Sequence, residues 1–326
     1  MRIFFILNIG LRVKLSNRFV GLCAALSFCA AAPAMAFELV HDQGTISLPA
    51  TPERIATFDL SVLESLNALD VDVAGVPKST YRNELAKYAD AAEVGTLFEP
   101  DYPALEKLKP ELIFAGGRSR NAVPKLREIA PTAVLENDAA DFLASFRRNN
   151  LALADAFQKK PQAQKAIDAI DADVQALHAA NQGKTGAFLF VIKGNVMAHA
   201  PGDRFGYAYE LAGLKSVLPA KDSDAPAAPR PEPGSPEAKA AETARAESIA
   251  TIAKAEPDWL IVLDRGAING GEKTAADTLA KHPSLSRTRA YSEGRVLYVD
   301  PNGWYVIGGG LNNLKRITEA MLAAMK

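Results

Sequence analysis

The sequence predicts an α/β protein of two Rossmann-like lobes with mainly parallel sheets, joined by a single long interlobe helix. Short apolar runs alternate with amphipathic stretches in the first half, which is typical of βαβ units. A helical pattern then covers residues 161–181, roughly 30 Å at 1.5 Å per residue, enough to connect two lobes. A second series of apolar runs begins directly afterwards, so we expect a second sheet there.

These observations divide the 326 residues into four segments. We expect a leader at 1–36, an N-terminal lobe at 37–160, the interlobe helix at 161–181 and a C-terminal lobe at 182–326. About 290 residues with nearly half apolar composition can bury a large core, and chains of this size usually divide into two parts.

The first lobe is predicted from its apolar runs and helical periodicities. Strands are expected at 55–58, 73–76, 112–115 and 133–135, and helices at 60–69 and 102–108. From residue 141 the chain has helical spacing, interrupted once at Pro161, where the interlobe helix begins.

The second lobe is predicted to contain strands at 186–192, 259–263 and 295–299 and a closing helix at 311–325. Residues 219–243 are rich in Ala, Pro, Glu and Lys and have no apolar periodicity. We therefore expect a flexible insertion there.

The first 36 residues have the pattern of a secretory signal peptide. Basic residues precede an apolar stretch at 19–32, and Ala34-Met35-Ala36 provides the small residues of a cleavage site, so the mature chain is expected to begin at Phe37. The apolar stretch is shorter than the roughly 20 residues that a membrane-spanning helix needs. The sequence thus indicates a periplasmic protein.

Both cysteines, Cys23 and Cys29, lie in this leader. The mature chain therefore has no disulfide, thiolate nucleophile or cysteine metal site. A lipid anchor on Cys29 is the alternative, but bulky Phe28 precedes it where a small residue is expected. Removing the leader's four basic residues leaves 33 basic and 38 acidic side chains, a net charge of −5, which argues against nucleic acid as a partner.

An arginine stands at the end of each of three apolar runs: Arg118, Arg204 and Arg265. Ligands of open α/β sheets bind beyond the carboxyl ends of the strands, so we expect these side chains to converge on one crevice. A guanidinium stays protonated and presents a rigid fork of donors, which suits a compact, multiply charged anion. One such arginine alone is usually an ordinary solvated or salt-bridged residue; the prediction depends on the threefold recurrence.

Six segments, taken in their order and spacing, carry a family resemblance: Pro52–Ala56, Val94–Tyr102, Leu108–Ile113, Gly202–Gly206, Pro257–Leu260 and Asp300–Tyr305. Over essentially its whole mature length the chain resembles the substrate-binding proteins of ABC importers for ferric siderophores, of the type with two lobes joined by a rigid helix. It is most similar to the catecholate-binding subgroup. The resemblance implies a monomer without a cofactor that takes an Fe(III)-siderophore and delivers it to an inner-membrane permease.

In that subgroup three cleft arginines hold the anionic iron–catecholate centre, and they fall on Arg118, Arg204 and Arg265, the same residues that the strand ends indicate. Arg120 is the alternative for the first position. The subgroup's tyrosine, which coordinates iron or packs on the ligand, matches Tyr305. A half-buried cap on the sheet is the competing interpretation of Tyr305, and Trp304 is expected in the core.

The chain departs from the family pattern in two places. Many members have a histidine ligand just before a Ser-Ile pair, where this chain has Arg245-Ala246-Glu247, so we expect capture of a saturated complex with Arg245 and His199 as further candidate contacts. The glutamates that dock the permease usually stand at positions 103 and 250, which are Pro103 and Ala250 here. The nearby acidic candidates are Glu99, Glu106 and Glu247.

Two other functions remain as alternatives. An arginine-rich crevice also suits an enzyme acting on phosphoryl or carboxylate groups, but the mature chain has no nucleophile elbow, phosphate-binding loop or His-Glu-x-x-His motif. A binding protein of the same fold for haem, a cobalamin or a hydroxamate siderophore is the second. Three arginines favour a polyanion, whereas a neutral hydroxamate complex would leave two of them without a role.

Overall fold

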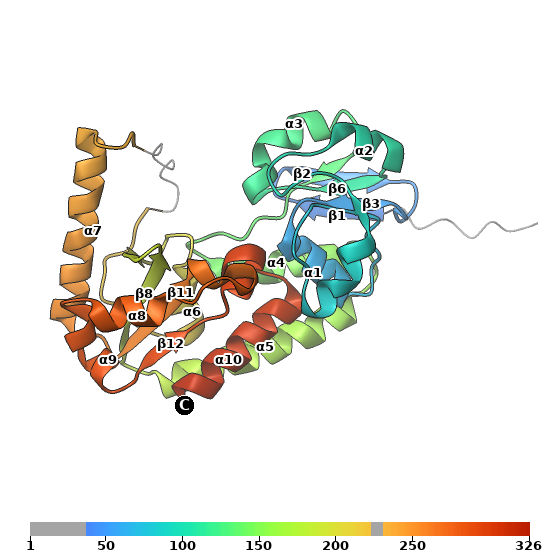
Figure 1. Ribbon diagram of the computed structural model, residues 1–326. Helices are drawn as coiled ribbons and strands as arrows, with labels where there is room; N and C mark the ends of the chain where they lie inside the picture. Colours follow the sequence, from blue (N-terminus) through green and yellow to red (C-terminus); the bar gives the residue numbers. More distant parts are fainter. Residues whose placement is uncertain (1–36, 223–230) are drawn as a thin grey trace, which may run out of the picture. The chain divides into compact units, whose positions relative to one another are not determined.

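The computed structural model describes residues 37–222 and 231–326. The predicted leader and residues 223–230 of the predicted insertion lie outside these ranges, so the expected cleavage site is not tested. The chain starts with an antiparallel hairpin of β1 (Phe37–His41) and β2 (Gly44–Leu48) (Figure 1). None of the described helices is long and apolar enough to cross a membrane.

The first half forms a parallel five-stranded sheet in the order β5-β4-β3-β6-β7. Its strands are β3 (Ile55–Thr57), β4 (Gly75–Val76), β5 (Ala92–Glu93), β6 (Leu112–Phe114) and β7 (Thr132–Ala133). The helices between them are α1 (Leu60–Ala68), α2 (Tyr102–Leu108) and α3 (Val123–Leu126), with the 3-10 segments η1 (Asn83–Asp90) and η2 (Gly117–Ala122). The βαβ prediction for this half is confirmed, although the two-residue strand β5 and the hairpin were not predicted.

The second half forms another five-stranded sheet, in the order β10-β8-β11-β12 with β9 antiparallel on β8. These strands are β8 (Thr185–Ile192), β9 (Asn195–His199), β10 (Lys215–Ser216), β11 (Trp259–Asp264) and β12 (Val296–Tyr298). β8 and β11 are buried along nearly their whole length, which explains their continuous apolar sequence. The remaining elements are α6 (Tyr207–Ala212), η3 (Arg265–Gly270), α8 (Ala275–Lys281), η4 (Leu285–Arg287), α9 (Arg289–Ser292) and the π-helical η5 (Asn302–Ile307).

Helix α5 (Lys160–Ala180) contacts both halves of the molecule. At its start, the Gln162 side-chain amide donates to the carbonyl of Ala68 in the first half at 2.9 Å. Just beyond its end, the Asn181 side-chain amide donates to the carbonyl of Ala212 in the second half at 3.0 Å. The helix starts and ends within one residue of the predicted boundaries.

Two further helices lie along α5: α4 (Phe142–Ala156) and α10 (Leu311–Met325). Figure 1 shows α5 and α10 side by side, and Lys315 on α10 forms a 2.7 Å ion pair with Asp173 on α5. One hydrophobic cluster runs from Phe37 in the hairpin to Met325 at the end of α10 and includes both sheets. Because the halves share this core, bending between them would disrupt packed side chains.

The predicted flexible insertion at 219–243 is wrong in its last part. Helix α7 (Pro236–Ala255) begins inside it, with Ser235 as N-cap accepting a 3.1 Å hydrogen bond from the Ala238 amide and Pro236 in the first turn. Ala, Glu, Lys and Arg are strong helix formers. The only buried residues of α7 are Ile249 and Ile252, so its first half offers no apolar periodicity to detect.

A buried carboxyl group joins α1 to α10. Glu64 is fully buried, accepts a 3.0 Å hydrogen bond from the Asn312 amide and has Arg316 Nη2 at 3.8 Å from its Oε1. Burial raises the pKa of Glu64 to about 8, although Arg316 and the backbone donors act in the opposite direction.

The shared core predicts one cooperative unfolding transition. Ile170 on α5 is 1% exposed, so Ile170→Ala should lower the free energy of unfolding by about 2–5 kcal/mol without dividing the transition. Urea denaturation followed by circular dichroism measures this, with exposed Lys165→Ala on the same helix as the control. Two separate transitions in the wild type would contradict a common core.

Glu64 predicts a pH dependence of stability. Its folded-state pKa of about 8 lies above the value of 4.5 for a free glutamate, so its stabilising contribution is present below pH 4.5 and is lost as pH rises through 8. The whole effect is at most about 5 kcal/mol. Glu64→Gln should flatten the decline in unfolding free energy over this range; an unchanged slope in the variant would contradict the assignment.

Candidate functional site

Three arginines from separate segments surround the ring of Tyr305. Arg118 stands in η2 after β6, Arg204 in the turn between β9 and α6, and Arg265 at the start of η3 after β11. Their guanidinium carbons lie 5.7, 4.3 and 4.8 Å, respectively, from the centre of the Tyr305 ring. The structure thus brings together the four residues that the sequence singled out. Arg118 and Arg265 follow strands that were predicted, whereas Arg204 follows β9, which was not.

Two of these guanidinium groups also bind the backbone of η5. Arg118 donates to the carbonyls of Tyr305 at 2.6 Å and Val306 at 3.1 Å, and Arg204 donates to the Tyr305 carbonyl at 2.9 Å. One carbonyl therefore receives hydrogen bonds from both halves of the molecule. Each guanidinium has five N–H groups, so donors remain for a ligand.

The charges around Tyr305 affect one another. Burial lowers the pKa of Arg118, and the neighbouring charge of Arg204 lowers it further, whereas Tyr305 and Asp59 act in the opposite direction. Burial alone would raise the pKa of the Tyr305 phenol, but the hydrogen bond from Arg265 and the charge of Arg204 outweigh it, so the pKa is lowered from 10. The site favours negative charge.

A pocket of about 460 Å³, the central pocket, lies beside this cluster. Its lining comes from both halves and includes Arg118, Arg204 and Tyr305, whereas Arg265 contacts the ring of Tyr305 from outside the lining. The pocket combines cations with aromatic surface, which suits a ligand that is both anionic and aromatic.

The aromatic wall was not predicted. Tyr207 stacks between Trp304, at 4.9 Å between ring centres, and Phe142, at 4.2 Å, and all three line the central pocket. Trp304 is 2% exposed, in agreement with its expected place in the core, yet it also forms part of this wall. The repeated aromatics of 204–207 were the available signal for Tyr207, but their spacing is also that of an ordinary buried helix.

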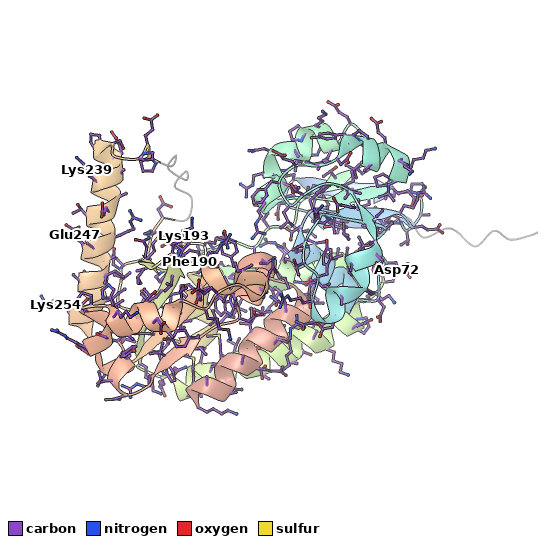
Figure 2. The ribbon with its side chains drawn as sticks, in the orientation of Figure 1. Asp72, Phe190, Lys193, Lys239, Glu247 and Lys254 are labelled. Atoms are coloured by element: carbon purple, nitrogen blue, oxygen red, sulfur yellow. The ribbon has the colours of Figure 1, made fainter. Side chains whose placement is uncertain are left out.

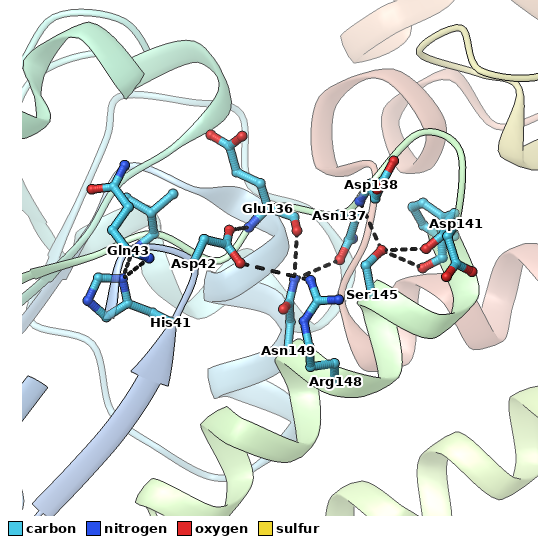
Figure 3. A network of polar contacts seen from close by, with 12 residues as sticks. His41, Asp42, Gln43, Glu136, Asn137, Asp138, Asp141, Ser145, Arg148 and Asn149 are labelled. Carbon is cyan, nitrogen blue, oxygen red and sulfur yellow. Dashed lines mark hydrogen bonds and ion pairs between the residues drawn. The ribbon is translucent and has the colours of Figure 1, made fainter. Parts of the chain in front are cut away.

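A polar network supports another wall of the pocket (Figure 3). The Asp42 carboxylate accepts a 2.7 Å hydrogen bond from the Glu136 amide, and Asn149 donates to the Glu136 carbonyl at 2.8 Å. Ser145 accepts a 2.9 Å hydrogen bond from the Asp138 amide. These contacts fix the segment that leads from β7 to α4 and contributes Glu136 and Asn137 to the lining.

Arg120 does not line the central pocket, and it does not contact the ring of Tyr305. Its guanidinium is paired with Glu136, which also accepts a 2.6 Å hydrogen bond from the Gly117 amide. Arg118 therefore occupies the first arginine position in the structure, and Arg120 is a partner of the pocket wall.

His199 and Arg245 are not part of the arginine cluster. His199 is packed between the rings of Phe188, Phe190 and Phe205, and burial lowers its pKa to about 4, so its ring is neutral at pH 7. Arg245 is exposed on α7, along which Figure 2 labels Lys239, Glu247 and Lys254, and lines a different surface groove. The expectation that these two residues belong with the three arginines is not supported by the structure.

The three acidic docking candidates are all exposed. Glu99 lies on a tight turn in which Thr96 Oγ1 accepts its amide hydrogen bond at 3.0 Å, Glu106 is on α2 and Glu247 on α7. Among the residues that the structure describes, no group of three or more His, Cys, Asp or Glu side chains could hold a metal ion.

Two sheets, helices that connect them and a pocket lined from both halves define a solute-binding protein of the α/β class. Residues 55–302 match the family described as Periplasmic binding protein, and the chain belongs to this family of substrate-binding proteins.

Similar proteins cover nearly the whole chain. The petrobactin-binding protein YclQ of Bacillus subtilis is 29% identical over 285 residues, which are 85% of this chain and 84% of YclQ. The ferric-anguibactin-binding protein FatB of Vibrio anguillarum is 25% identical, with 86% and 85% covered. The crystal structure of the iron uptake ABC transporter substrate-binding protein PiuA from Streptococcus pneumoniae superposes with a TM-score of 0.75 at 25% identity, covering 89% of this chain and 99% of PiuA.

The arginine cluster predicts an acidic phenol at Tyr305. In an absorbance titration of tyrosine ionisation, one group should titrate below pH 10 in the wild type and be absent from Tyr305→Phe. Arg265→Ala should move its pKa upward, because the hydrogen bond and the charge that favour the phenolate are removed. Indistinguishable curves for the wild type and Tyr305→Phe below pH 10 would contradict this description.

Proposed function

We propose that this chain captures a ferric siderophore, an anionic catecholate complex, in the central pocket and delivers it to an ABC permease. The observation that carries the proposal is the convergence of Arg118, Arg204 and Arg265 on Tyr305 at one end of an aromatic-lined pocket. Three catecholates on Fe(III) leave a net charge of −3, and charge-assisted hydrogen bonds to such a centre are stronger than neutral ones. The names of YclQ and FatB support an iron-complex cargo.

The proposed complex is held as a saturated unit. His199 packs against three phenylalanine rings and does not line the central pocket, so direct capture of iron by a histidine and tyrosine pair has no support at this pocket. Tyr305 remains the one proposed residue that either packs on the ligand or coordinates its iron. Iron is thus cargo in this proposal, and the protein needs no resident cofactor.

The lining of the central pocket also argues against a hydroxamate cargo and against an enzyme. A neutral hydroxamate complex would leave the two lining arginines desolvated without a counter-charge, which is unfavourable. For an enzyme, the pocket lining contains no cysteine or histidine, and its carboxylates Asp59 and Glu136 are engaged by backbone donors. A binding function therefore suits the pocket better than catalysis.

The proposal also includes a cellular location, an oligomeric state and contacts to the permease. We place the mature protein in the periplasm as a monomer after removal of residues 1–36, in keeping with the family. Glu99, Glu106 and Glu247 are the proposed contacts to the permease, because all three carboxylates are exposed on rigid elements of the two halves.

Removal of single arginines tests the proposed cargo. Arg118→Ala or Arg204→Ala should weaken binding of ferric enterobactin, used as a probe, about ten- to hundredfold, the range for a hydrogen bond to a charged group. Arg265→Ala should cost less, because Arg265 lies outside the pocket lining. Lysine at position 118 or 204 should restore only part of the affinity, since it lacks the planar fork.

Quenching of tryptophan fluorescence on titration gives the affinities, and Arg245→Ala, which removes an exposed arginine on α7, is the matched control. Wild-type affinity in all three alanine variants of the cluster would reject the proposal. Tight binding of haem or a ferric hydroxamate, with weak binding of the catecholate, would favour the second cargo class.

A further inference from the structure

A second pocket, of about 270 Å³, lies next to the central pocket. The two pockets share Leu60 and Ile307 in their linings, so η5 and the start of α1 border both of them. Val306 also lines the second pocket, and its carbonyl accepts the 3.1 Å hydrogen bond from Arg118 of the central pocket. A residue of the central pocket therefore holds part of the border of the second.

The second pocket contains a cation that no other described group engages. Arg82 lines it, and among the residues that the structure describes no hydrogen bond, ion pair or ring contact engages the Arg82 guanidinium. The other cations near η5 are different: Arg118 and Arg204 bind carbonyls, and Arg316 is paired with Glu84 at 2.7 Å. Arg82 is thus available to an anion from outside the chain.

The backbone that carries Arg82 is held on both sides. The Tyr81 hydroxyl donates to the Pro77 carbonyl, and Glu84 forms its ion pair with Arg316 on α10. The guanidinium extends toward the second half, where its Nη2 lies 3.4 Å from the position that a Cβ on Gly270 would occupy. Gly270 ends η3, the segment that begins with Arg265, so Arg82 lies beside the segment that carries Arg265.

The rest of the lining combines polar side chains with four aliphatic ones. Asn83, Asn302 and Asn313 contribute amide groups, and Thr80 contributes a hydroxyl. Part of two amides is already engaged, because the Asn302 oxygen accepts from the Asn269 amide at 3.0 Å and the Asn313 nitrogen donates to the Gly303 carbonyl at 3.0 Å. Asp300 is the one carboxylate of the lining, and its two oxygens accept hydrogen bonds from the Asn302 amide at 3.1 Å and the Gly303 amide at 2.9 Å. Asp300 keeps its negative charge, but each of its oxygens has a backbone donor, whereas no described group engages Arg82.

We propose that the second pocket binds a polar arm of the same ligand, one that ends in a carboxylate, with Arg82 pairing the carboxylate and the asparagine amides bonding the arm. The inference rests on the proposed function, since the arm belongs to a complex whose iron centre sits at Tyr305. The ligand class it names is an extended ferric catecholate with a free carboxylate, as opposed to a compact, closed one.

A matched pair of probes separates the arm from the iron centre. Cyclic ferric enterobactin has no free carboxylate, whereas its linear form, with the lactone opened by hydrolysis, carries one at the end of the chain. Arg82→Ala should weaken binding of the linear complex about five- to tenfold and leave binding of the cyclic complex unchanged. The effect lies in the lower part of the range for a hydrogen bond to a charged group because Arg82 is exposed.

Three further variants define the outcomes. Arg82→Lys should retain part of the preference, and Arg287→Ala, an exposed arginine on η4, should change neither affinity. A thermal unfolding midpoint equal to that of the wild type shows that Arg82→Ala is folded. If Arg204→Ala weakens both complexes and Arg82→Ala affects them equally or not at all, the arm site is rejected while the proposed function stands; if Arg204→Ala also has no effect, both fall.

Discussion

The site depends on a clamp, the pair of hydrogen bonds that arginines from both halves donate to one short backbone segment. The Tyr305 carbonyl accepts hydrogen bonds from Arg118, which follows a strand of the first sheet, and Arg204, which follows a strand of the second. A hydrogen bond from a charged donor is worth about 1.5–3 kcal/mol. This clamp sets the position of the Tyr305 ring, the wall of the central pocket and, through Val306, the wall of the second pocket.

The same clamp explains why the cluster holds together without an anion. Three guanidinium groups near one ring repel one another, but the carbonyls of η5, the face of the ring and its acidified phenol supply partial negative charge. An incoming polyanion provides more complete compensation. The pocket is therefore formed in advance, and the shared core of α4, α5 and α10 keeps its two sides in register.

Much of this arrangement was predictable because strand ends and apolar runs are local signals. A buried parallel strand such as β11 is continuously apolar, so its end, and with it Arg265, can be located by the change in composition. The exact placement of Arg118 over Arg120 was not, since that choice depends on Glu136, which reaches Arg120 from a different strand end. His199 illustrates the same limit: its place on a strand was visible, but the three surrounding phenylalanines come from segments that meet only in the fold.

Features built from exposed residues or from long-range contacts had no comparable signal. The first half of α7 is helical because of intrinsic propensity and a good N-cap, not because a face is buried, so a search for apolar periodicity finds nothing there. Arg82 lies in a stretch of mixed polarity before a 3-10 segment, and only the fold brings it into one pocket lining with residues of η5. In the proposed function, specificity is divided between two kinds of residue: the strand-end arginines would set the charge of the ligand centre, and loop residues of the second pocket would select the shape of what is attached to it.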